Sequence, residues 1–62
     1  MHERDIYDNY MDAYSQFIDY DGLSHREARK EAMDIVREQL EYLGFNKYLA
    51  SAAVLKAIRI HS

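Results

Sequence analysis

The sequence feature that most constrains the fold is a central segment that marks both ends of its own helix. Ser24 followed three residues later by Glu27 is a capping box, which predicts that a helix begins immediately after Ser24. Gly44 can adopt a left-handed backbone conformation, and this predicts a Schellman stop in which Phe45 folds back on the last helical turn. We therefore expect a helix over residues 25–43.

Two glycines divide the rest of the chain. Glycine occurs only at positions 22 and 44, and proline is absent, so the 62-residue chain is interrupted at two places. Apolar residues recur at helical spacing on either side of both points, and Asn46 is a suitable N-cap for the last segment. The sequence predicts one all-α domain over residues 1–62, a small three-helix bundle. The predicted helices cover residues 4–20, 25–43 and 47–60.

Four aspartates form an acidic stripe on the polar side of the first predicted helix. At the spacing of a helix they fall within an arc of roughly 60°. They are Asp5, Asp8, Asp12 and Asp19. Aspartate is a poor residue for a helix interior, and like charges four residues apart repel each other, so this helix is locally suboptimal. Such a stripe is most often a solvated face, and the alternative is a contact surface for a basic partner.

The formal net charge of −3 conceals a gradient along the chain. Residues 1–24 have a net charge of −5, and residues 45–62 have a net charge of +3. Opposite charges favour pairing of the first helix with the last, either within one chain or between two chains.

The third predicted helix is apolar nearly all round. One apolar face contains Leu49, Ala53, Ala57 and Ile60. A second apolar face contains Tyr48, Val54, Leu55 and Ile58. The first two helices can cover only one face, and a domain of this length buries only about 60% of the surface that its unfolded chain exposes. We therefore expect self-association through the second face as a homodimer, with a foreign protein as the alternative occupant.

Gln39 is the polar exception in the apolar arc of the central helix. A buried glutamine needs a hydrogen-bond partner, and it can then fix the register of a helical assembly. The alternative is that Gln39 lies at a loosely covered edge of the bundle.

No group of residues indicates an enzyme. His2, His25 and His61 stand far apart in the sequence, and none forms a nucleophile arrangement with a nearby serine or aspartate. Cysteine is absent, and so is a glycine-rich phosphate loop. The acidic turn before the central helix aligns poorly with a calcium-binding loop, because Phe17 and Ala28 would occupy two ligand positions. We expect no catalysis, no cofactor and no metal.

The predicted function is that of a non-enzymatic protein-interaction module. Its size and acidic, tyrosine-rich surface suit a small regulator or inhibitor of the kind found in bacteria and phages. It would bind a protein through the first helix, the third helix or both. No apolar run approaches the roughly 18 residues of a membrane span, and residues 1–5 do not resemble a signal peptide, so we expect a cytoplasmic protein.

A small DNA-binding regulator is the alternative. A helix-turn-helix would turn at Gly44 and direct Lys47, Tyr48 and Ser51 toward DNA. Leu40 stands where that motif usually has a small residue, and the third helix has only three basic residues, so nucleic acid is the less favoured partner.

One loop and one helix also resemble part of another binding module. Leu43-Gly44-Phe45, followed by Ala50, Ala53 and Val54, resembles the first loop and second helix of ubiquitin-associated domains. Such a domain would need a further helix after residue 62, so the resemblance implies no function for this chain.

Overall fold

The computed structural model describes residues 2–61, and they form three helices without a strand. The helices are α1 (Glu3–Asp19), α2 (His25–Tyr42) and α3 (Lys47–His61). The predicted all-α fold is therefore confirmed, and every helix end lies within one residue of its predicted position.

Side-chain caps begin α2 and α3 where the sequence predicts. The Ser24 hydroxyl oxygen accepts a hydrogen bond from the backbone N–H of Glu27 at 3.2 Å, and the hydroxyl donates to the Glu27 carboxylate at 3.0 Å. At the start of α3, the Asn46 side-chain oxygen accepts from the backbone N–H of Leu49 at 2.8 Å. Both caps satisfy backbone donors that have no partner within the helix.

The C-terminus of α2 is the predicted Schellman motif. Gly44 has a positive φ of 108°. The N–H groups of Gly44 and Phe45 donate to the carbonyl oxygens of Glu41 and Leu40, at 3.0 and 3.1 Å respectively. These two bonds close the last helical turn and direct the chain into α3.

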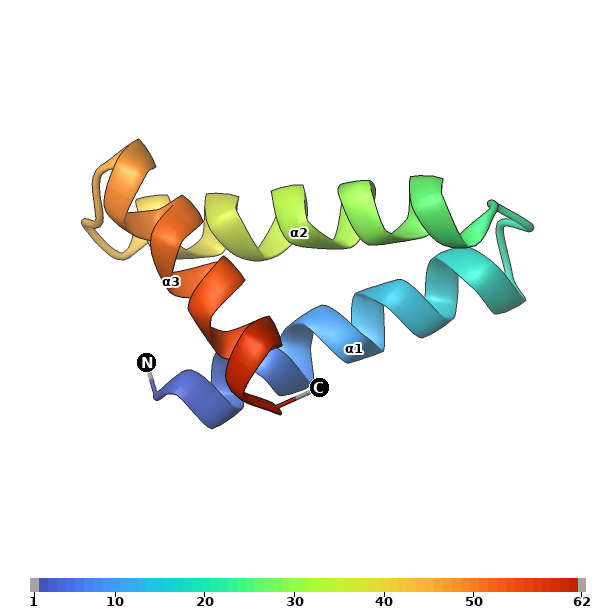
Figure 1. The fold of residues 1–62 in the computed structure, drawn as a ribbon. Helices are drawn as coiled ribbons and strands as arrows, with labels where there is room; N and C mark the ends of the chain where they lie inside the picture. The colour runs from blue at the N-terminus through green and yellow to red at the C-terminus, as the bar shows by residue number, and fades with distance from the viewer. Residues whose placement is uncertain (1, 62) are drawn as a thin grey trace.

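The helices α1 and α2 form an antiparallel hairpin in the shape of a V (Figure 1). Its arms meet at the turn around Gly22, which has a positive φ of 68°, and they diverge toward the N-terminus of α1. The third helix crosses the open end of the V on one face and contacts both arms. Among residues 2–61, no helix covers the opposite face of the open end.

The core lies where the three helices meet. Its largest fully buried side chains are Leu40, Val36 and Val54. Alanines from α2 and α3, including the fully buried Ala50 and Ala57, fill much of the remaining core. Because alanine is small, it allows the backbone of α3 to approach the hairpin closely.

The buried side of α3 differs from the prediction. The side that faces the hairpin contains Ala50, Val54 and Ala57, and Val54 is only 1% exposed. Ile58 is half-buried and packs against the core. The prediction that Val54 lies in an exposed patch is therefore wrong. Ala50 and Ala57 permit the closest approach of α3 to the hairpin. The buried side of α3 therefore lies between the two predicted apolar faces, and it contains Ala57 from the first face and Val54 from the second.

The predicted pairing of the acidic first helix with the basic last helix occurs within the chain. Lys56 Nζ lies 3.1 Å from Glu3 Oε1. Both side chains are about half-exposed, so this ion pair contributes at most about 1 kcal/mol to stability. Together with a ring contact between His61 and Tyr7, it places the end of α3 beside the start of α1.

Candidate interaction surfaces

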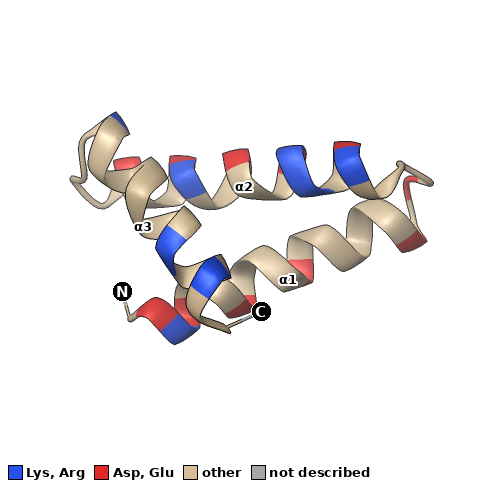
Figure 2. Ribbon diagram, in the orientation of Figure 1, with Lys and Arg blue, Asp and Glu red and all other residues tan. Residues whose placement is uncertain are grey.

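The acidic stripe lies on the exposed side of α1, as predicted. All four aspartates are solvent-exposed, and Figure 2 shows acidic residues along this helix. Asp8 is 3.7 Å from Arg4, and the Asp5 carboxylate accepts a hydrogen bond from the backbone N–H of His2 at 3.4 Å. Asp12 and Asp19 have no ion pair or hydrogen bond within the described residues. The stripe therefore offers carboxylates that are free to contact a partner.

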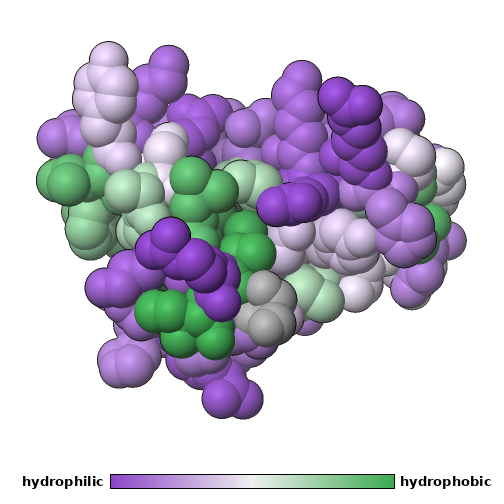
Figure 3. All heavy atoms as spheres, in the orientation of Figure 1, coloured by the Kyte–Doolittle hydropathy of each residue, from purple (hydrophilic) through white to green (hydrophobic). Residues whose placement is uncertain are grey.

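The residues predicted for self-association do not share one surface. Tyr48 is 85% exposed and Leu55 is also exposed, whereas Val54 is buried and Ile58 is half-buried. The large apolar side chains that α3 leaves in solvent define its outer side. They are Tyr48, Leu49, Leu55 and Ile60. Figure 3 shows that apolar side chains over α3 are interrupted by hydrophilic ones.

Gln39 is exposed, which agrees with the alternative of a loosely covered edge. On α2, Met33 and Arg37 line a hollow together with residues of α3. Ile35 and Gln39 stand two positions further along and therefore lie on the other side of α2. They line an open groove of about 570 Å³ between α1 and α2, which we call the back groove. Its lining residues are Asn9, Ile35, Glu38, Gln39, Tyr42 and Leu43.

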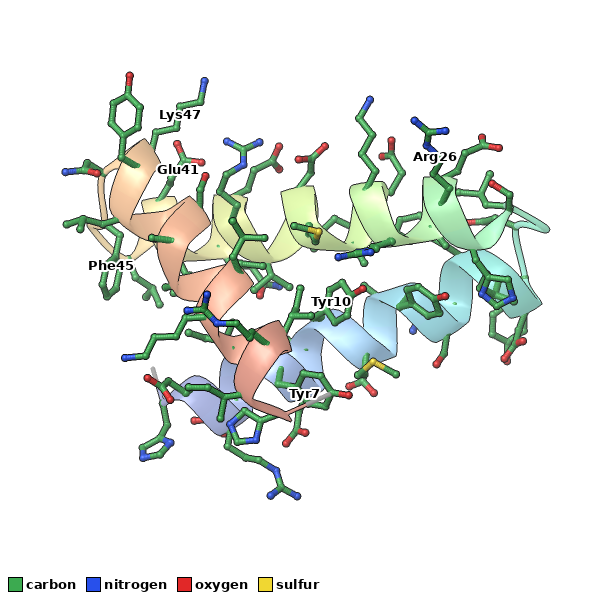
Figure 4. The ribbon with its side chains drawn as sticks, viewed as in Figure 1. Tyr7, Tyr10, Arg26, Glu41, Phe45 and Lys47 are labelled. Atoms are coloured by element: carbon green, nitrogen blue, oxygen red, sulfur yellow. The ribbon has the colours of Figure 1, made fainter. Side chains whose placement is uncertain are left out.

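Three tyrosines of α1 form an aromatic row that ends in a histidine at each side. The ring centroids of Tyr10 lie 6.3 Å from Tyr7 and 5.8 Å from Tyr14. The His61 ring lies 5.5 Å from Tyr7, and the His25 ring lies 5.9 Å from Tyr14. The Tyr14 hydroxyl and His25 Nδ1 are joined by a hydrogen bond of 2.6 Å. Figure 4 shows Tyr10 directed toward α2 and Tyr7 beside the end of α3.

The sequence alone does not reveal this row, because His25 and His61 stand far from each other and from the tyrosines that they contact. The spacing of Tyr7, Tyr10 and Tyr14 does place them on one helix face. Their contacts with His25 and His61, however, depend on how the three helices are arranged in space. The row, Arg29, Met11 and Ile58 line a second open groove of about 390 Å³ on the face of the hairpin that carries α3.

Burial raises the pKa of the Tyr10 phenol above its usual value of about 10, while the nearby Arg29 guanidinium acts in the opposite direction. A pKa that is higher in the folded than in the unfolded state stabilises the fold below pH 10, and this contribution is lost as the pH rises through the folded value. In a spectrophotometric titration, Tyr10→Phe should therefore remove the phenol that ionises at the highest pH. It should also reduce the fall in the free energy of unfolding at alkaline pH. Tyr20→Phe, at an exposed position, is the control and should leave that ionisation in place.

The described residues contain no group of three or more His, Cys, Asp or Glu side chains that could hold a metal ion. Within residues 2–61, no helix has the length and apolar character needed to cross a membrane. Comparison of the chain with family models, curated proteins and solved structures gave no match.

Proposed function

We propose that the protein is a non-enzymatic interaction module that regulates or inhibits a protein partner by binding it. The observation that supports this most directly is the exposed acidic stripe, in which Asp12 and Asp19 have no partner within residues 2–61. Asp8 and Asp12 stand four residues apart on α1 and repel each other, so the helix carries a local cost. A basic partner surface would relieve this repulsion on binding.

Replacement of the stripe should move stability and binding in opposite directions. Asp8→Asn, Asp12→Asn and Asp19→Asn in one variant should raise the free energy of unfolding by roughly 0.2–0.5 kcal/mol. The repulsion along α1 is relieved and Asp19 no longer opposes the helix dipole, and these gains exceed the loss of the exposed Arg4–Asp8 pair. The same variant should bind the partner more weakly and with a smaller salt dependence. Affinity capture with mass spectrometry identifies the partner, and titration at several salt concentrations then compares the variants.

Asp21→Asn removes one negative charge outside the stripe and is the control for net charge. It should leave binding close to the wild-type level. A triple variant with wild-type affinity and wild-type salt dependence would show that the stripe is only a solvated face.

Self-association through the outer side of α3 is part of the same proposal. Leu55 and Tyr48 are exposed there, and a 62-residue domain gains from additional buried surface. In sedimentation equilibrium at micromolar concentration, we expect a dimer for the wild-type chain and a folded monomer for Leu55→Glu. Tyr20→Glu, near the turn between α1 and α2, should remain dimeric. A wild-type chain that is folded and monomeric would contradict self-association and leave the outer side of α3 to a foreign protein.

A DNA-binding regulator is the second candidate, because Lys47 and Tyr48 are exposed at the start of α3. Ser51 is half-buried and Lys56 already pairs with Glu3, so few groups are available for phosphate contacts. Binding to duplex DNA with a linear fall of log affinity against log salt would favour this candidate over protein binding.

A further inference from the structure

The back groove lies on the face of the hairpin that α3 leaves open. The arms of the V diverge at this end, and α3 covers the gap on the other face (Figure 1). Ile35 and Leu43 are partly exposed in the back groove, and Tyr42 is 91% exposed. The gap that accommodates α3 on one face therefore presents uncovered apolar side chains on the other.

Both rims of the back groove carry carboxylates. On α2, Glu38 lines the groove and Glu31 lies two turns earlier on the same edge. On α1, Asn9 lines the groove, and Asp5 and Asp12 lie one turn to either side of it. All four carboxylate side chains are exposed to solvent.

The basic residues of α2 lie on its opposite edge. Arg26, Arg29 and Lys30 line a hollow together with Met33, which is the side of α2 that meets α3. Figure 4 shows Arg26 pointing away from α1. No lysine or arginine of the described residues lines the back groove. The groove therefore combines an apolar floor with negative rims that lack a neutralising charge.

The apolar floor and the negative rims together indicate what kind of molecule the back groove can bind. If two copies of the protein met through their back grooves, the carboxylates of one copy would lie beside those of the other, and this contact is electrostatically unfavourable. The outer side of α3 in a second copy is engaged in the dimer proposed above, and its Lys56 already pairs with Glu3. We propose that the back groove binds a basic amphipathic helix of a partner protein, with apolar residues against Ile35 and Leu43 and with Lys or Arg toward the rims. This inference rests on the proposed function and names the partner's chemistry.

Three synthetic peptides test the inference without knowledge of the natural partner. Each is about 18 residues long, which is five helical turns. The first has leucines on one helix face and lysines on the other, the second has glutamate in place of lysine, and the third has the composition of the first without a single apolar face. Only the first should bind strongly at low salt. Its NMR shift changes should centre on Asn9, Ile35, Gln39 and Leu43.

Matched substitutions then separate the groove from general charge. Tyr42→Ser and Glu38→Lys should each weaken binding of the leucine–lysine peptide at least about tenfold. Tyr20→Ser, at a similarly exposed tyrosine that is 85% exposed and lies near the turn between α1 and α2, should change binding less than about twofold. Asp21→Lys changes an exposed carboxylate outside the acidic stripe, in the turn between α1 and α2, and it too should have less than about a twofold effect.

Several results would overturn the inference. They are an absence of binding, shift changes centred on α3, equal binding of the third peptide, and an effect of Asp21→Lys as large as that of Glu38→Lys. These results are distinct from failure of the proposed function. A partner whose capture depends on the acidic stripe but not on Tyr42 or Glu38 would retain the interaction module and exclude the back groove as its site.

Discussion

Leu40→Ala is expected to lower the free energy of unfolding by about 2–5 kcal/mol, the largest stability effect that we predict for a single substitution. Leu40 is 0% exposed and lies in the core cluster to which all three helices contribute. Truncation leaves a cavity among residues such as Ala32 and Ala50, which are too small to fill it. A domain with a total stability near the lower limit of about 5 kcal/mol would retain only about 0–3 kcal/mol, so at the upper end of the expected loss about half of the molecules would be unfolded.

Urea denaturation followed by circular dichroism measures the effect. Leu49→Ala is the matched control, because it removes the same atoms from a side chain that is 58% exposed. Its loss should be below about 1 kcal/mol. Equal losses for Leu40→Ala and Leu49→Ala would contradict the packing of α2 against α3.

Gly44→Val should lower the free energy of unfolding by about 1–3 kcal/mol. The φ of 108° at Gly44 is a conformation that a β-branched residue adopts only with strain. Apart from its two chain neighbours, a Cβ atom at this position would meet no atom within 4 Å, so the loss reports the backbone conformation and not a clash with the rest of the fold. The Schellman bonds that close α2 would be strained together with it.

Gly44→Asn is the informative comparison for this substitution. Asparagine tolerates positive φ better than other residues with a Cβ atom, so its loss should be clearly smaller than that of valine. Denaturation midpoints of the two variants provide the measurement. If valine and asparagine were equally well tolerated, α2 would not end in the left-handed conformation described for Gly44.

Local chemistry explains why the sequence alone located the helices. Ser24, Gly44 and Asn46 act through hydrogen bonds and backbone angles within a few residues of themselves, so their effects can be read without knowing the fold. The exposure of the acidic stripe followed for a similar reason. Carboxylates that share one polar arc of a helix are costly to bury, whichever neighbour covers the apolar arc.

Only the tertiary structure decided which apolar side of each helix is buried and which residues far apart in the sequence come into contact. Helical periodicity shows which residues share a face, but it does not give the angle at which helices cross or how closely they approach. The alanines of α3 set the close approach that buries Val54, and the divergence of α1 and α2 leaves Gln39 exposed in the back groove. The contact of His61 with Tyr7 likewise exists only because α3 crosses back to the start of α1.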